Sequence, residues 1–164
     1  MTKPKAMHYL FYPSQNDRNA DPLIVWFTGT QGCSSLLAAF HEIGPFVFQP
    51  GRMTFTRNEN SWNKKANLLF LEIPAGVGYS DGPTENITDA TYNIDALYTI
   101  RNFFGRFPSY KKNDFYLAGH GYGAVNIAYL AQTIIDENND PLTIYNDDIK
   151  LKGILIGNPC VRPD

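Results

Sequence analysis

Four short apolar runs alternate with helix-like segments along this chain, and they constrain its fold more than any other feature. The runs cover residues 23–27, 68–72, 115–118 and 153–156. They are apolar almost without interruption, as are strands of a parallel sheet that is covered on both faces. A weaker candidate strand, residues 8–12, stops at Pro13. The sequence therefore predicts an α/β fold with buried strands.

Three segments between these runs have the period of an amphipathic helix. Thr88 is suited to cap the first, whose helical spacing ends at Gly105 and Pro108. Residues 124–136 and 34–43 form the other two. Alternating strands and helices predict a mostly parallel sheet with helices on both faces. Residues 45–65 show no clear period and are expected to lie over the sheet ends.

Length and composition fit a single domain that covers residues 1–164. The chain has 164 residues, 43% of them hydrophobic, and a formal net charge of -2. That is enough for one core, and it provides no basic stripe for nucleic acid. No apolar stretch is long enough to predict a transmembrane segment, and the first residues do not read as a signal peptide.

The two cysteines, Cys33 and Cys160, are too few for a disulfide scaffold and match no zinc pattern. We therefore expect no metal and no other cofactor. Both cysteines follow predicted strand ends, so a bridge between them is conceivable. Two free thiols are the favoured interpretation.

Ligands of open parallel sheets bind beyond the carboxyl ends of the strands, which directs attention to two glycine-rich loops. The first covers residues 28–35, and the second covers residues 119–123. The second loop joins a predicted strand to a predicted helix, where an α/β-hydrolase carries its nucleophile elbow, G-x-S-x-G. Its middle residue here is Gly121, which has no hydroxyl.

Several segments in order resemble the serine carboxypeptidases, a branch of the α/β-hydrolases. They are Trp26 with Gly29, Gly32, Cys33, Ser34 and Ser35; then residues 42–46, 61–63, 66–72, 74–80, 107–108, 114–119 and 156–158. The resemblance implies a partial α/β-hydrolase fold in which the C-terminal strands and the lid are missing.

Carried over position by position, the resemblance places the nucleophile at Gly121 and replaces the carboxylate-binding Asn by Thr28. The acidic residue before the nucleophile becomes His120, and the Gly-Pro of the oxyanion loop becomes Thr30-Gln31. We therefore predict no catalytic residue, but two vestigial regions. The vestigial elbow comprises Gly119, His120, Gly121, Tyr122 and Gly123, and the vestigial oxyanion and carboxylate-binding region comprises Trp26, Thr28, Gly29, Thr30 and Glu42.

Chain order gives a second argument. Hydrolases of this fold supply Ser, then Asp or Glu, then His, whereas the only histidines, His8, His41 and His120, all precede Gly121. The resemblance implies that the acid and the base would lie beyond Asp164. A lone His120 is expected to be a hydrogen-bonded filler, because it has no metal-ligating partners nearby in sequence.

Other residues could in principle carry chemistry. Cys33 or Ser34 opens a predicted helix, whose dipole can lower a thiol pKa, and is the alternative nucleophile. The resemblance instead implies that Cys33 is a structural residue, which is the favoured interpretation. Glu42 and Glu72 are expected to be buried or half-buried hydrogen-bonding residues.

The favoured hypothesis is a catalytically inactive serine carboxypeptidase-like protein that serves as a structural or interaction subunit of a multi-subunit complex. A protein partner would cover the apolar strand at residues 153–156. The alternative is a fragment or divergent member of an active serine carboxypeptidase, a hydrolase that releases C-terminal residues from peptides, or a remnant that still binds peptide C-termini. Without a recognisable signal peptide, an intracellular location is favoured over a secreted, lysosomal or vacuolar one.

Overall fold

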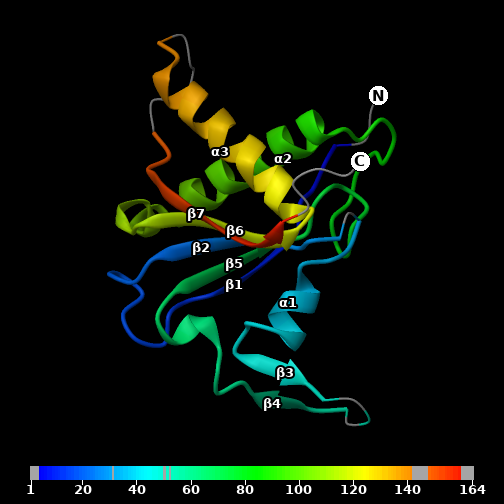
Figure 1. Ribbon diagram of the computed structural model, residues 1–164, viewed down its shortest axis with the longest axis vertical. Helices are drawn as coiled ribbons and strands as arrows, with labels where there is room; N and C mark the ends of the chain where they lie inside the picture. Colours follow the sequence, from blue (N-terminus) through cyan, green and yellow to red (C-terminus); the bar gives the residue numbers. More distant parts are fainter. Residues whose placement is uncertain (1–3, 31, 50, 52, 142–147, 160–164) are drawn as a thin grey trace.

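The computed structural model describes residues 4–30, 32–49, 51, 53–141 and 148–159 (Figure 1). Five strands form the main sheet: β1 (Tyr9–Tyr12), β2 (Leu23–Phe27), β5 (Asn67–Leu71), β6 (Phe115–Gly121) and β7 (Leu151–Pro159). Two further strands, β3 (Phe46–Phe48) and β4 (Phe55–Arg57), pair with each other. The helices are α1 (Leu36–His41), α2 (Asp89–Arg106) and α3 (Gly123–Asn139), with short 3-10 turns η1 (Trp62–Lys64) and η2 (Pro108–Lys112).

The main sheet is parallel except at one edge, as the sequence predicts. Its strand order is β1-β5-β2-β6-β7, and only β1 runs antiparallel to its neighbour. In the centre, Trp26 of β2 pairs with Phe70 of β5 on one side and with Ala118 of β6 on the other. The carboxyl ends of β2, β5, β6 and β7 therefore meet at one edge of the sheet, where the glycine-rich loops begin.

Alternate residues of β2 face opposite layers, which explains why the whole strand is apolar. Leu23, Val25 and Phe27 belong to the core under α2 and α3. Ile24 and Trp26 belong to the second core under α1. Figure 1 shows α2 and α3 on one side of the sheet and α1 on the other. The predicted cover of helices on both faces is thus confirmed.

Helix α2 begins where its sequence predicts. The side-chain oxygen of Thr88 accepts a hydrogen bond from the backbone N–H of Thr91, and the side-chain oxygen of Thr91 accepts one from the backbone N–H of Thr88, which forms a capping box. Asp89 then occupies the first turn, where a negative charge is favourable. Ile94 lies on the outside of this helix and is 48% exposed, whereas Leu97 and Phe104 are buried.

The segment from residue 45 to 65 is not an irregular loop. Its strands β3 and β4 form an antiparallel hairpin that packs beside α1, with the ring of Phe40 5.1 Å from that of Phe55. Figure 1 shows this hairpin extending beyond α1, away from the main sheet. Each strand has three residues, which is too short for a periodicity signal.

Strand β7 is longer and more exposed than the sequence suggests. It pairs with β6 and, within the described ranges, with no strand on its other side. Ile154, Leu155 and Ile156 are each 40–43% exposed. The prediction that this run is a buried strand is therefore wrong, because an edge strand has one open side.

Two asparagine side chains fix the loop that precedes β2. Asn67 and Asn113 each donate from Nδ2 to the carbonyl oxygens of Arg18 and Asp21, over distances of 2.7–3.2 Å. Both asparagines are buried at the amino ends of their strands. Side chains thus satisfy the carbonyls of Arg18 and Asp21 in this loop.

None of the helices in the described part of the chain has the length and hydropathy needed to span a bilayer.

Candidate functional site

The turn between β6 and α3 has the shape of a nucleophile elbow. Strand β6 ends at Gly121 and α3 begins at Gly123, so that Tyr122 alone separates them. Gly121 has a φ of +55°, a value that residues with side chains rarely adopt. A Cβ atom at this position would lie 3.1 Å from the carbonyl oxygen of Gly29. The backbone therefore turns as an elbow does, at a residue that has no side chain.

The loop after β2 lies directly against this turn. The backbone N–H of Tyr122 donates to the carbonyl oxygen of Gly29 at 2.9 Å. A Cβ atom on Gly29 would come within 2.4 Å of the carbonyl oxygen of His120, so a side chain does not fit there. In hydrolases with this elbow, the N–H after the nucleophile is an oxyanion-hole donor. Here that donor is bound to a carbonyl oxygen of the protein itself.

The other predicted elbow residues come together around the same turn. Gly119 pairs with Phe27 across β6 and β2. The hydroxyl of Tyr122 lies 3.1 Å and 3.3 Å from the carboxylate oxygens of Asp89, to which it can donate, and so links the elbow to the first turn of α2. The predicted cluster of residues 119–123 is thus one compact turn.

The loop residues Thr28 and Thr30 turn toward α1. The hydroxyl of Thr28 donates to the hydroxyl oxygen of Ser35 at 3.2 Å, and the carbonyl of Thr30 accepts from the N–H of Cys33 at 3.1 Å. Gln31, the other replaced residue of this loop, lies outside the described residues.

Trp26 and His120 stack beneath the two loops. Their ring centroids are 5.7 Å apart with an interplanar angle of 31°. Nε1 of Trp26 and Nδ1 of His120 are buried, and neither has a hydrogen-bond partner among the described residues. The expectation that His120 is a hydrogen-bonded filler is not met at Nδ1 among the described residues, and its ring packs against that of Trp26 at a tilt.

Glu42 is not buried with Trp26 and His120. It caps the carboxyl end of α1 and is exposed to solvent. Its backbone carbonyl accepts a hydrogen bond from the side chain of Asn58 at 3.0 Å. The expectation of a buried or half-buried Glu42 is wrong, since α1 ends at the surface.

Glu72, in contrast, is fully buried, as expected of a hydrogen-bonding glutamate. Oε2 lies 2.7 Å from Nδ1 of His8 and accepts from the backbone N–H of Tyr79 at 2.9 Å. Oε1 accepts from the hydroxyl of Ser34. Glu72 thus joins the strand β1 region, the start of α1 and the loop after β5. The sequence gives no signal for its partners His8 and Ser34, because they are distant along the chain.

A small polar cavity of about 10 Å³ lies under the loop after β2, between Thr28, Ser35, Tyr92 and Asn126. That is space for about one water molecule. Oδ1 of Asn126 is buried and has no hydrogen-bond partner in the described part of the chain. Burial raises the pKa of Tyr92, and the side chain of Asn126 opposes this rise only in part. The one sequence signal for this cavity is a polar Asn126 beside the apolar stripe of α3.

The described residues offer no metal centre and no disulfide. No group of three or more His, Cys, Asp or Glu side chains in these ranges could hold a metal ion. Cys33 is half-buried and has a free thiol within the described residues, while Cys160 lies outside them. The hydroxyl of Ser34, the other alternative nucleophile, donates to Glu72.

Comparison with known proteins agrees with this geometry. The family model described as serine carboxypeptidase matches residues 1–164. Serine carboxypeptidase-like 36 of Arabidopsis thaliana is 42% identical over 161 residues, which are 96% of this chain and 32% of the relative. The chain spans about a third of the length of the curated relatives that it matches.

Solved structures agree on the fold. Kex1(Δ)p, a prohormone-processing carboxypeptidase from Saccharomyces cerevisiae, superimposes with a TM-score of 0.76 at 27% identity, over 93% of this chain and 38% of that one. Est1E of Butyrivibrio proteoclasticus, solved with ferulic acid bound, has a TM-score of 0.52 at 20% identity, over 79% and 45% of the two chains. The fold is that of the α/β-hydrolases.

Proposed function

Because this chain belongs to the serine carboxypeptidase family, we propose that it is a member without hydrolytic activity that acts as a structural or interaction subunit of a larger assembly. The observation that carries the proposal is Gly121. It occupies the elbow with a φ of +55° and has no hydroxyl. An acyl-enzyme needs an oxygen or sulfur nucleophile at this point, so none can form there.

The oxyanion donor supports the same proposal. The N–H of Tyr122 is bound to the carbonyl of Gly29 at 2.9 Å. A developing oxyanion would have to displace that carbonyl before it could use the N–H, whereas effective stabilisation requires donors that are already directed at the oxyanion.

Few contacts near the elbow favour another residue as the nucleophile. The hydroxyl of Ser34 donates to the buried Glu72, and its oxygen also accepts from the N–H of Leu36 at 3.1 Å. A hydroxyl held in this way fixes the start of α1. In the described part of the chain no histidine is hydrogen-bonded to Ser34, so the base that activates a serine is not in place there.

The subunit role rests on the open edge of β7. Ile154, Leu155 and Ile156 present 40–43% of their surface to solvent beside backbone that pairs only with β6 in the described ranges. Unpaired apolar edge strands promote association unless another chain covers them. A partner chain that adds a strand would cover this edge.

Two experiments test the proposal. We expect no adduct when the purified chain is treated with a fluorophosphonate probe and weighed by intact mass spectrometry, with an active serine hydrolase as the positive control. Stoichiometric labelling would overturn the claim of inactivity. A partner should co-purify from the native source, and a monodisperse monomer at high concentration would contradict the need for one.

A second candidate is that these residues form part of an active carboxypeptidase. It is favoured by one observation, that the chain spans about a third of its relatives' length. The native mass decides between the candidates. A product of about three times this length that cleaves peptides from the C-terminus would support the second candidate and contradict the first.

A further inference from the structure

Strand β7 has an open side in the described ranges, and its central residues read the same in both directions. The run Gly153-Ile154-Leu155-Ile156-Gly157 is symmetrical about Leu155. Over this run β7 pairs with β6 residue by residue, whereas the register shifts just before Gly153 and just after Gly157. The symmetrical sequence thus coincides with the regular part of the strand.

The side chains of this run are divided between the two faces of the sheet. Ile154 lies beside Leu117, which belongs to the core under α2 and α3. Leu155 lies beside Ala118, which belongs to the core under α1. Because opposite residues of paired strands share a face, Ile154 and Ile156 face the side of α3, and Leu155 faces the side of α1. Both faces of this edge are therefore apolar.

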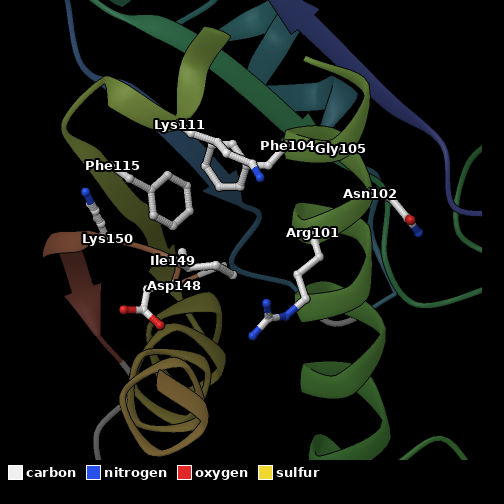
Figure 2. Close-up of a pocket in the computed structure, with 9 residues that line it drawn as sticks. All are labelled: Arg101, Asn102, Phe104, Gly105, Lys111, Phe115, Asp148, Ile149 and Lys150. Carbon is white, nitrogen blue, oxygen red and sulfur yellow. The ribbon is translucent and has the colours of Figure 1, made fainter. Parts of the chain in front are cut away.

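The edge strand is held in place at its amino end. Ile149, two residues before β7, is buried in the core beside the rings of Phe104 and Phe115, next to the cavity in Figure 2. The side chain of Asn138 accepts from the N–H of Ile149 at 3.2 Å and donates to its carbonyl oxygen at 2.9 Å. Since the backbone before β7 is fixed in this way, a partner would meet a preformed strand and would not have to order it.

We propose that β7 pairs with β7 of a second copy of this chain, antiparallel and about a two-fold axis at Leu155. A strand that pairs with its own copy about a two-fold axis runs antiparallel to it, because each residue must face its symmetry mate. In this register Leu155 faces Leu155 of the copy, and Ile154 faces Ile156. The glycines that end the run face each other as well. The inference rests on the proposed subunit role and names the partner as the chain itself.

Charge and side-chain type favour this register. Residues 153–157 carry no charge, and the flanking Lys152 would face the uncharged Asn158 of the copy. Like charges directly opposite each other destabilise paired strands, and residues 152–158 would bring none together. The isoleucines of the two copies would meet on one face and the two leucines on the other, so that each copy covers the apolar side chains of its mate. A two-fold contact also closes, which leaves neither β7 edge open to a third copy.

Cysteine cross-linking tests the register. Opposite residues of antiparallel strands have Cα atoms about 4.5–5.5 Å apart, within the span of a disulfide, whereas diagonal neighbours are about 7–8 Å apart, beyond it. In a background of Cys33→Ser and Cys160→Ser, Leu155→Cys should form a disulfide-linked dimer upon oxidation with diamide. Ile154→Cys and Ile156→Cys are the matched controls. Neither residue faces itself, so each variant alone should stay uncross-linked, whereas an equimolar mixture of the two should cross-link.

Light scattering on the unmodified chain measures the assembly without any substitution. We expect a mass of twice 18.5 kDa at about 100 µM, since a small interface gives a dissociation constant on the order of 10 µM. Circular dichroism checks the folding of each cysteine variant.

Two results would overturn the self-pairing and leave the subunit role intact. One is association in which Ile154→Cys alone cross-links as fast as Leu155→Cys. The other is a different protein bound along β7 in the native source, with no self-association of the purified chain. A monodisperse monomer that has no partner in the native source would overturn both the self-pairing and the subunit role.

Discussion

Nδ1 of His8 and Oε2 of Glu72 lie 2.7 Å apart, although the two residues are 64 positions apart in sequence. The same carboxylate accepts from the N–H of Tyr79 and from the hydroxyl of Ser34. Since the Glu72 side chain is 0% exposed, water cannot replace any of these partners. The pair therefore connects the amino-terminal region to the loop after β5 and to α1.

Glu72→Gln should destabilise the chain. The amide keeps one acceptor oxygen and presents two N–H donors, so at least one donor among His8, Tyr79 and Ser34 loses its acceptor. We expect a loss of about 1–3 kcal/mol in the free energy of unfolding, measured by urea denaturation. Glu59→Gln is the control, because Glu59 is 72% exposed. Equal stability of the two variants would contradict the role of Glu72.

Gly121→Ser should restore the elbow sequence but not hydrolysis. The serine would adopt a φ of +55° with its Cβ atom 3.1 Å from the carbonyl of Gly29, at a cost of about 1–3 kcal/mol. We expect lower thermal stability and no fluorophosphonate adduct, because the N–H of Tyr122 is already bound. Gly105→Ala, at a helical glycine with open space, should instead gain about 0.5–1 kcal/mol. Labelling of Gly121→Ser would show that the elbow is functional.

Ser14 should control the acidity of Asp21. Its hydroxyl donates to Oδ2 of Asp21 at 2.5 Å, and with the backbone N–H of Asp17 it holds the pKa of that carboxyl below its ordinary value. A lowered pKa in the folded state stabilises the fold above the ordinary pKa of about 3.9. That contribution is lost as the pH falls through the lowered value.

Ser14→Ala should therefore raise the pKa of Asp21 toward its ordinary value and weaken the dependence of stability on pH in acid. An NMR titration of the Asp21 carboxyl carbon measures the shift. Thr133→Ala, which removes an exposed hydroxyl on α3, should leave the Asp21 titration unchanged. An unaltered pKa in Ser14→Ala would show that the other groups around the carboxyl, Asp17, Asn16 and Lys65, set it without Ser14.

Asn113→Ala should loosen the loop before β2. The substitution removes donors to the carbonyls of Arg18 and Asp21 at 2.9 and 2.7 Å. Asn67 still donates to both carbonyls, so we expect the loss of two ordinary hydrogen bonds, about 0.5–1.5 kcal/mol each. Asn139→Ala is the matched control, because Asn139 also donates to a backbone carbonyl but at an exposed helix end. Hydrogen exchange should rise across residues 15–22 in the first variant only.

Leu155→Lys should reduce self-association of the isolated chain. Leu155 is 43% exposed on the edge strand β7, and a lysine on an edge strand opposes pairing with another chain. Light scattering over a concentration series should show a smaller mass for this variant than for wild type. Tyr129→Lys, which changes an exposed aromatic residue of α3, should leave the mass as in wild type. If both substitutions lowered the mass equally, the added positive charge would explain the result, and the edge of β7 would not.

Most of the fold could be predicted from the periodicity of apolar residues and from local capping residues. The apolar run at residues 23–27 predicts a central strand because both of its faces are covered, and Thr88 predicts the start of α2 because capping is local. The hairpin of β3 and β4 lacks such a signal, since three-residue strands show no period. The open edge at residues 153–156 was expected from the resemblance, which implies that the neighbouring strands are missing, whereas the apolar run around Ile154 by itself indicates a buried strand.

For the candidate site, too, the local features could be predicted from the sequence and the long-range contacts could not. The elbow at Gly121 follows from a local pattern of glycines between a strand and a helix, and the structure has that turn. The exposure of Glu42, the orphaned Nδ1 of His120 and the partners of Glu72 each depend on contacts between distant segments. A single sequence contains no signal for such contacts.

The hydrogen bond from the N–H of Tyr122 to the carbonyl of Gly29 also has an evolutionary consequence. A substitution that placed a hydroxyl at position 121 would leave the N–H of Tyr122 bound to Gly29 and so unable to stabilise an oxyanion. A substitution that freed this N–H would leave position 121 without a nucleophile. Neither step alone offers selection any gain in hydrolysis. If the proposed inactivity holds, hydrolysis at this elbow would require two changes together, one at position 121 and one in the loop that contains Gly29.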